Sequence, residues 1–397
     1  MPPLEVLIPA DIRFPLERAN GVQIVKTAGA LARAGVQVTL LVRQTDPRPT
    51  AEILALYGLR AEPELTVRRL PVRHRPGAFA ISRASFLART IVAAVSTRER
   101  AAVYTRDLQL ADLLLRLGRV APVVVYEAHA VESLMYEERG RLYGTGERPS
   151  PRKRRRLADR EGRVWRRAAG FVTTTAGIRD SFVEAHGPRD RVRVIPNGCD
   201  VPESRTFQGI RLDGVPRIVY AGQLYPWKGV DVLVEAMTRL PSARLVILGG
   251  IEGEADTDRI RALVAARGLF SRTEMLGTVP QAQVAKELEA ASVVAVPFLR
   301  SGMTERHTSP IKAFEAMAAG RPIVASDLPS SREFLRHEEN ALLVPPGDPD
   351  LLAAALRRLL DGPGLAARLA HAAFDEAPQF SWDARGERVR ELLEEVR

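Results

Sequence analysis

Short apolar runs alternate with segments of helical length along nearly the whole chain. In the first half the runs lie at residues 6–9, 36–42, 65–72, 102–105, 123–127, 171–175 and 192–196. In the second half they lie at residues 217–222, 244–250, 273–277, 293–298, 322–326 and 341–345. Continuous runs rich in β-branched residues, separated in this way, are typical of parallel strands that are buried on both faces. The pattern therefore predicts two doubly wound α/β domains.

One break in this pattern indicates where the domains meet. The stretch IPNGCDVPESRTF interrupts the periodicity with prolines and a glycine before the next run opens at Arg217. We expect a first domain over residues 1–203, a second over 204–378, and a final helix within 379–397 that begins after Ser381. Open parallel sheets bind ligands beyond the carboxyl ends of their strands, so two facing sheets predict a cleft between the domains.

The segment HTSPIKAFEAMAAGRP, residues 307–322, carries clear helix start and stop signals. Ser309 is suited to be the N-cap and Pro310 the first helical residue. Gly320 stands where a left-handed residue is expected to end the helix. Polar groups crowd the first turn, and one carboxylate lies a turn further in; these residues are His307, Thr308, Ser309, Lys312 and Glu315.

Three other positions follow predicted strands and are candidates for ligand binding. Asn20 and Gly21 form a turn before a long amphipathic helix, which would present free backbone N–H groups to an anion; the alternative is a plain tight turn. His129 follows the run at 123–127, where it could exchange protons or bond a sugar hydroxyl, although a single histidine is more often structural. Lys228 lies at a helix start, where its charge opposes the helix dipole, which favours phosphate binding over a plain surface role.

Composition and charge narrow the classes of protein. The chain has 397 residues with 46% hydrophobic and 27% charged residues, which is typical of a globular protein of about two domains. It has one cysteine, Cys199, which excludes an internal disulfide framework. We see neither a signal peptide nor a membrane-spanning run, and we expect a cytoplasmic protein. The absence of GxGxxG and GxxxxGK[ST] disfavours NAD-dependent and P-loop chemistry.

The net charge of +10 has two interpretations. It reflects either an arginine-rich composition or a basic surface that meets anionic lipid head groups or phosphorylated substrates. The densest basic cluster covers residues 152–156 and reads either as a solvated helix face or as a surface that docks on the inner face of a membrane. No aromatic residues interleave with it in the manner of a nucleic-acid site, so we expect no nucleic-acid partner.

Several stretches together resemble the retaining glycosyltransferases of family 4, which have the GT-B architecture. They are GQLYPWKG, LGTVP, SVVAVPF and SPIKAFEAMAAGRPIVASDLPSSRE in the second half and, more loosely, RANGVQIVK, YEAHAVES and VIPNGCD in the first. The resemblance implies transfer of a sugar from a nucleotide diphosphate sugar to an acceptor hydroxyl, with no cofactor and no metal. It also implies that the last helix returns to the first domain.

The resemblance assigns roles to particular residues. Lys228 and the amides of Ile311 and Lys312, which follow Pro310, would face the diphosphate. Glu315 would hold the ribose hydroxyls. His129 would lie near the donor sugar. The remaining donor positions are Gly222 and Gln223 after the first strand of the second domain, and Thr278 and Val279, whose backbone would meet the base.

Two positions depart from the family pattern. An acid is expected eight residues before Glu315, where this chain has His307, and Gln223 stands where an arginine is common. Our hypothesis is that His307 and Thr308 contact the donor sugar and that Arg300 or Arg306 supplies charge.

No pair of carboxylates has the arrangement of a hydrolase, so we predict that the leaving phosphate takes the acceptor proton. The cluster at 152–156 suggests a lipid-linked or cell-envelope glycan as acceptor. The alternatives are a catalytically silent binding protein of the same architecture and a nucleotide-sugar epimerase.

Overall fold

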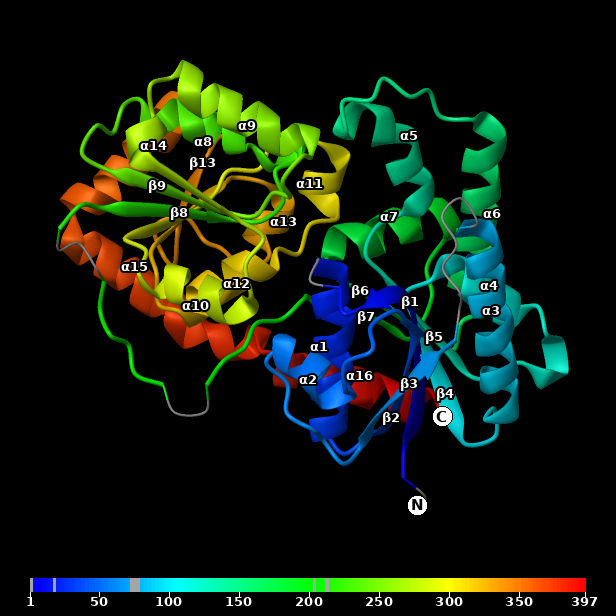
Figure 1. Cartoon of the computed structure of the whole chain (residues 1–397). Coiled ribbons are helices and arrows are strands. Elements are labelled where there is room, and N and C mark those ends of the chain that lie inside the picture. Colours follow the sequence, from blue (N-terminus) through cyan, green and yellow to red (C-terminus); the bar gives the residue numbers. More distant parts are fainter. Residues whose placement is uncertain (1–2, 17–18, 72–78, 203–204, 211–213) are drawn as a thin grey trace. The chain divides into compact units, whose positions relative to one another are not determined.

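The computed structural model describes residues 3–16, 19–71, 79–202, 205–210 and 214–397. The described chain divides into two compact units. The first comprises residues 1–134, 150–197 and 382–397, and the second comprises residues 135–149 and 198–381. The expected boundary at residues 203 and 204 lies outside the described residues. Figure 1 shows a parallel sheet in each unit, with helices packed on it.

The first unit is built on a seven-stranded parallel sheet in the order β3-β2-β1-β4-β5-β6-β7. Its strands are β1 Glu5–Phe14, β2 Gln37–Gln44, β3 Leu65–Leu70, β4 Ala101–Thr105, β5 Val124–Ala128, β6 Gly170–Thr173 and β7 Val192–Val194. Its helices are α1 Ala19–Arg33, α2 Thr50–Leu56, α3 Phe79–Ser96, α4 Leu108–Leu115, α6 Pro151–Arg167, α7 Ala176–His186 and α16 Trp382–Val396, together with the 3-10 turn η1 Gly118–Val120. Helix α5, Glu132–Leu142, begins in this unit and ends in the second.

The second unit is built on a six-stranded parallel sheet in the order β10-β9-β8-β11-β12-β13. Its strands are β8 Arg217–Ala221, β9 Arg244–Leu248, β10 Thr273–Gly277, β11 Val293–Val296, β12 Ile323–Ser326 and β13 Leu342–Val344. Its helices are α8 Val230–Met237, α9 Ala255–Ala266, α10 Gln281–Glu289, α11 Gly302–Arg306, α12 Ile311–Ala318, α13 Pro329–Arg332, α14 Pro349–Asp361 and α15 Pro363–Glu376, with the 3-10 turns η2 Pro226–Lys228, η3 Phe270–Arg272 and η4 Ala377–Phe380.

Both strand orders confirm the prediction of two doubly wound α/β domains. In each sheet the order reverses beside the first strand, β1 in one unit and β8 in the other, so the carboxyl ends of these strands lie at the topological switch point. Each of the apolar runs that the sequence analysis named coincides with a strand. The central strands, such as β4, β5, β6 and β11, are buried throughout and are therefore continuously apolar, whereas the edge strands β3, β7 and β10 are only partly buried.

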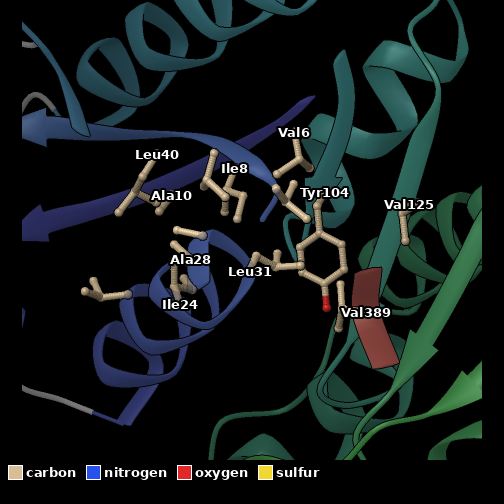
Figure 2. Packing of buried hydrophobic residues seen from close by; sticks show 14 of the residues in the cluster. Val6, Ile8, Ala10, Ile24, Ala28, Leu31, Leu40, Tyr104, Val125 and Val389 are labelled. Carbon is tan, nitrogen blue, oxygen red and sulfur yellow. The ribbon is translucent and has the colours of Figure 1, made fainter. Parts of the chain in front are cut away.

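Helix α16 packs against α1 in the first unit, so the chain crosses back to this unit near its C-terminus. Trp382 and Val389 of α16 are buried, and Val389 joins the core that β1, β2 and α1 build. Figure 2 shows Val389 near Leu31 of α1 and Tyr104 of β4. Within the described residues, no helix is both long and apolar enough to cross a lipid bilayer.

Candidate functional site

The carboxyl ends of β8, β9 and β10 approach one another closely because glycines stand there. Gly249 has a φ of +127°, and its N–H donates to the carbonyl of Gly277 over 2.7 Å. A Cβ at Gly249 would lie 1.9 Å from the carbonyl oxygen of Gly222, so no other residue fits. Thr278 continues this contact, since its hydroxyl donates to the carbonyl of Gly250 over 3.2 Å. The predicted donor positions Gly222 and Thr278 thus lie on one edge of the second sheet.

Lys228 ends the turn η2 and precedes α8. Its Nζ lies 4.2 Å from the ring centroid of Trp227 and 4.4 Å from that of Phe298. Gly229 makes this turn: its φ is +70°, and a Cβ there would lie 1.8 Å from the carbonyl oxygen of Pro297. Lys228 is partly buried, and desolvation by the surrounding atoms lowers its pKa to about 7.

Lys228 forms no ion pair within the described residues. Three acids of the same unit, Asp231, Glu287 and Glu315, pair with other cations. Two aromatic faces attract a cation but do not neutralise it. When Lys228 is protonated, the site therefore holds a positive charge that favours an anion.

Glu315 lies in a small polar triad. Its Oε1 accepts a hydrogen bond of 2.5 Å from Gln281 Nε2, and its Oε2 lies 2.8 Å from Lys312 Nζ. Lys312 Nζ also donates to Gln281 Oε1 over 3.3 Å. The side chain of Glu315 is only 12% exposed, so these contacts hold the carboxylate in one place.

Gln281 is a candidate that the sequence analysis missed. It begins α10 directly after Pro280 and follows the strand end LGTVP. A polar residue at a helix start just beyond a parallel strand is a signal that could have found it. Its pairing with Glu315, from a separate helix, has no signature in the sequence.

Helix α12 begins one residue later than expected. Pro310 is the N-cap, with a φ of −83° and a ψ of 107°, so the prediction of Ser309 as N-cap was wrong. The extended ψ of Pro310 delays the helical dihedrals to Ile311. The first intrahelical bond runs from the N–H of Ala313 to Pro310 O over 3.0 Å, so the amides of Ile311 and Lys312 precede the ladder. Gly320, with a φ of +63°, is the expected left-handed residue.

The segment before α12 holds the residues expected to contact a sugar. His307 is buried with an exposed fraction of 5%, and neither ring nitrogen has a hydrogen-bond partner. Burial, together with the charge of Arg306, lowers the pKa of His307 to about 4, so the ring is neutral at pH 7. The hydroxyl of Thr308 donates to the carbonyl of Met303 over 3.0 Å.

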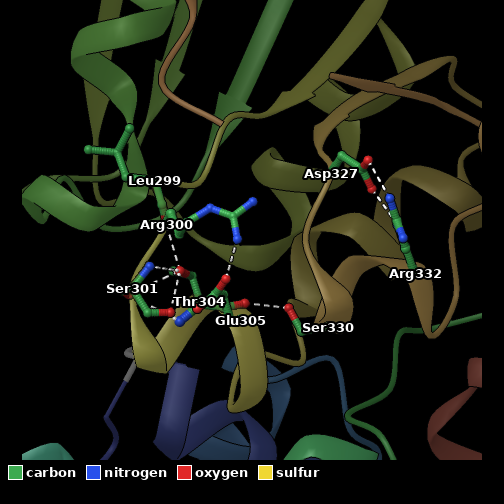
Figure 3. Close-up of polar contacts among 8 residues, drawn as sticks. All are labelled: Leu299, Arg300, Ser301, Thr304, Glu305, Asp327, Ser330 and Arg332. Carbon is green, nitrogen blue, oxygen red and sulfur yellow. Dashed lines mark hydrogen bonds and ion pairs between the residues drawn. The ribbon is translucent and has the colours of Figure 1, made fainter. Parts of the chain in front are cut away.

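Helix α11 is built tightly against this segment. Ser301 caps it, and the Thr304 hydroxyl donates to the carbonyl of Leu299 over 2.5 Å. The hydroxyl of Ser330 donates to the carbonyl of Thr304 over 2.5 Å, and these contacts are drawn in Figure 3. Arg300, one of the expected charge donors, pairs with Glu305 instead of standing free.

The other donor positions have structural contacts. The carbonyl of Gln223 accepts a hydrogen bond of 2.6 Å from the hydroxyl of Tyr220, while the Gln223 side chain makes no hydrogen bond within the described residues. Val279 is partly buried against the core of the second unit. These contacts do not identify Gln223 or Val279 as a ligand-binding residue.

In the first unit, the prediction of a turn at Asn20 and Gly21 before the helix was wrong. Helix α1 already begins at Ala19, so both residues lie in its first turn rather than before it. Gly21 is needed for packing, because a Cβ there would lie 2.0 Å from the carbonyl oxygen of Leu16. The Asn20 side chain accepts from the N–H of Gly21 over 3.0 Å. The glycine therefore reflects a close backbone approach within a helix.

His129 follows β5 and lies against a buried carboxylate. Its Nε2 is 2.8 Å from Glu127 Oε1, and its side chain is 20% exposed. Burial and the charge of Arg106 lower the pKa of His129 to about 4, against the opposing effect of Glu127. Burial alone would raise the pKa of Glu127, but Arg385, His129 and Arg106 hold it well below its ordinary value. The ring is therefore neutral and the carboxylate ionised at pH 7.

A small pocket opens beside this pair in the first unit. Its polar lining is Gln23, Thr27, Tyr104, Arg106 and Glu127. Arg106 Nη1 donates to Gln23 Oε1 over 2.8 Å. In the part of the chain that the structure describes, no three His, Cys, Asp or Glu side chains gather closely enough to bind a metal ion.

Comparisons with known proteins agree with this architecture. The profile of the family "Glycosyl transferase 4-like domain" matches residues 21–198, and that of "Glycosyl transferases group 1" matches residues 215–362. The D-inositol 3-phosphate glycosyltransferase of Corynebacterium glutamicum is 25% identical over 94% of this chain and 91% of that protein. The enzyme of the same name from Acidothermus cellulolyticus is 32% identical over 54% of this chain, and the match spans only 50% of that relative.

A similar fold occurs in the solved structure of sucrose-phosphate synthase from Thermosynechococcus elongatus. It superposes with a TM-score of 0.77 over 99% of both chains at 20% sequence identity. At this identity the likeness shows the fold alone.

Proposed function

The chain belongs to the family 4 glycosyltransferases of the GT-B architecture, and from this we propose that it transfers a sugar from a nucleotide diphosphate sugar to an acceptor hydroxyl, with retention at the anomeric carbon. The observation that carries the proposal is Lys228. Its ammonium group lies against two aromatic rings without an acidic partner in the described chain. A diphosphate supplies the missing negative charge.

The other residues of the proposed donor site also belong to the second unit. The amides of Ile311 and Lys312, which precede the first hydrogen bond of α12, are free to face phosphate oxygens. Glu315 accepts hydrogen bonds from the ribose diol, and Gln281 orients its carboxylate. The base lies against the backbone of Thr278 and Val279.

These groups stabilise the charge that develops during the reaction. Breaking the glycosyl phosphate bond places negative charge on the diphosphate, which Lys228 and the N-terminus of α12 stabilise. The leaving phosphate oxygen then takes the proton of the acceptor hydroxyl as that oxygen bonds to the same face of the anomeric carbon. No metal takes part in this proposal, and activity that survives EDTA supports it.

Donor binding is tested by thermal shift with UDP, GDP, ADP and TDP and their sugars, followed by sugar-release assays. A ligand at 100 times its dissociation constant adds about 2.7 kcal/mol to the free energy of unfolding. We expect one base to give a shift that Lys228→Ala removes. Lys286→Ala is the matched control, because Lys286 is exposed on α10. No shift with any nucleotide would favour a silent homologue, and release of an epimerised sugar without any acceptor would favour an epimerase.

His307 and Thr308 are proposed to contact the donor sugar in place of the family acid. The support is that the buried ring of His307 has two unpartnered nitrogens, which a sugar hydroxyl could satisfy. The double variant His307→Ala and Thr308→Ala should therefore lose donor turnover. Turnover at the wild-type rate would refute this assignment.

The acceptor is proposed to be a glycan or a phosphorylated polyol at an anionic membrane. The relatives' names specify D-inositol 3-phosphate as their substrate. All five basic residues at 152–156 are exposed on α6, and Arg152, Arg155 and Arg156 form no ion pair within the described residues. Vesicles with anionic lipid should sediment the protein at low salt and release it at high salt. Sedimentation that depends on neither lipid charge nor salt would contradict membrane association.

A further inference from the structure

A buried carboxylate in the first unit receives contacts from three other elements and from the residue that follows its own strand. Glu127 of β5 accepts a 2.9 Å hydrogen bond from Gln23 of α1 and a hydrogen bond from Arg385 of α16, both at Oε1. Its Oε2 accepts a 2.5 Å hydrogen bond from the hydroxyl of Tyr104 of β4. His129 Nε2 lies 2.8 Å from Oε1, although its N–H is not aligned for a hydrogen bond. Such a carboxylate cannot rotate without breaking several bonds.

Arg385 is itself fixed from other directions. It is 1% exposed, and its Nε donates to Thr27 Oγ1 over 3.1 Å. Its Nη1 donates to the carbonyls of Ile195 and Pro196 over 2.8 and 2.7 Å. The guanidinium therefore anchors α16 to the first unit and presents its remaining donor, Nη2, to Glu127.

The charge of Glu127 favours one position for the proton of His129. The ring N–H is not aligned with Oε1 as a hydrogen bond, but at 2.8 Å the carboxylate attracts an N–H and repels a lone pair, so we infer that the proton of the neutral ring resides on Nε2. Nδ1 then carries a lone pair, and it makes no hydrogen bond within the described residues. The charged groups that face the ring are Glu127 of β5, Arg106 after β4 and Arg385 of α16.

We propose that Arg385 is a positioning residue that acts through Glu127: it holds His129 as the neutral Nε2–H tautomer, so that Nδ1 accepts a hydrogen bond from a hydroxyl of the donor sugar. The sugar contact rests on the proposed function. The tautomer and its dependence on Arg385 rest on the contacts of the first unit alone. A C-terminal helix remote in sequence thus sets the chemical form of a residue at the end of β5.

The test is NMR of the full-length protein with isotope-labelled histidine, between pH 4 and 8. The chain has six histidines, and the His129→Asn variant assigns the signal. In the wild type we expect unprotonated Nδ1, protonated Nε2, and no titration above about pH 5. A wild-type ring with its proton on Nδ1 would overturn the proposal.

Two variants should shift the titration in opposite directions. Arg385→Met removes one of the two cations, Arg385 and Arg106, that act on Glu127 and His129, so the pKa of His129 should rise. Glu127→Gln removes the anion, so the pKa should fall and the preference for one tautomer should be lost. Arg390→Met is the matched control, since Arg390 lies on the same helix but pairs with Glu387 and Glu394 at the surface. An unchanged His129 titration in folded Arg385→Met would overturn the role of Arg385.

If Arg385→Met does not fold, two more conservative variants can still test the proposal. Tyr104→Phe removes one hydrogen bond to Glu127, and Arg385→Lys keeps the charge; both should shift the His129 signals in the direction of Arg385→Met but less far. Neither variant shifting them would overturn the proposal.

Activity provides the second readout. For Arg385→Met we expect kcat to fall about 10- to 100-fold, as when the partner that orients a histidine is removed, with donor affinity little changed. Arg385→Lys should recover part of kcat. If the wild type transfers no sugar from any donor, the proposed function fails, and the NMR experiment still decides the tautomer.

Discussion

The two units differ in whether their charged side chains have partners within the protein. In the first unit, Glu127 is ionised and surrounded by hydrogen-bond donors and the guanidinium of Arg385. In the second unit, Lys228 lies between aromatic rings without an acid within the described chain, and neither nitrogen of His307 has a partner. The Glu127 carboxylate is thus satisfied by protein groups alone. The arrangement in the second unit is incomplete, because desolvated polar groups cost free energy until a ligand bonds them.

We expect the largest effect, a loss of stability, when the ion pair between Glu127 and Arg385 is broken. Arg385→Met leaves Glu127 as a buried charge without its cation, which typically costs about 3–5 kcal/mol of stability. Urea unfolding measures this loss. The double variant Glu127→Gln and Arg385→Met should recover part of it, because no ion then remains uncompensated. If Arg390→Met lost the same free energy of unfolding, the loss in Arg385→Met could not be attributed to the ion pair with Glu127.

The next effect separates activity from stability in the second unit. Lys228→Met should lower turnover about 100-fold or more, the loss of roughly 3 kcal/mol expected for one electrostatic donor at a leaving group. Its melting temperature should stay the same or rise, since a desolvated cation is replaced by an apolar side chain. A variant that is less stable but fully active would contradict the role given to Lys228.

Donor affinity should depend on pH through the same lysine. The protonated amine binds a diphosphate, and its pKa of about 7 means that affinity falls as the pH rises from 7 to 9, by at most about 10-fold per pH unit. Titration calorimetry with a nucleotide sugar measures this, because its diphosphate does not titrate in that range. Lys228→Arg keeps its charge throughout and should show a flat profile; an equally steep profile would assign the pH dependence to another group.

The smallest effect concerns the residue that the sequence analysis missed. Gln281→Leu removes the hydrogen bond to Glu315 but keeps the volume, and a bond of about 1.5 kcal/mol corresponds to a roughly 10-fold higher donor KM. The control is Gln283→Leu on the same helix, whose side chain makes no hydrogen bond in the described structure. Equal kinetics in both variants would remove Gln281 from the donor site.

Local patterns sufficed for much of the fold. Each apolar run coincides with a strand, and the central strands are buried on both faces, which requires continuous apolar residues; the edge strands β3, β7 and β10 are only partly buried. Gly320 ended α12 as expected, because only glycine adopts a positive φ at little cost. The start of α12 was misplaced by one residue, since dihedral angles at a helix end depend on the loop that precedes it. Asn20 and Gly21 resembled a turn, but both lie in α1, and the glycine is needed because a Cβ there would clash with the carbonyl of Leu16.

Only the tertiary structure decided the partners of the candidate residues. The sequence pointed to Glu315, Lys228 and His129 from their places after strands and at helix starts. It contained no sign that Gln281 bonds Glu315, or that Arg385 bonds the carboxylate beside His129. The physical reason is that strand and helix signals act over a few neighbouring residues, whereas these contacts join distant segments that come together only when helices pack on a sheet.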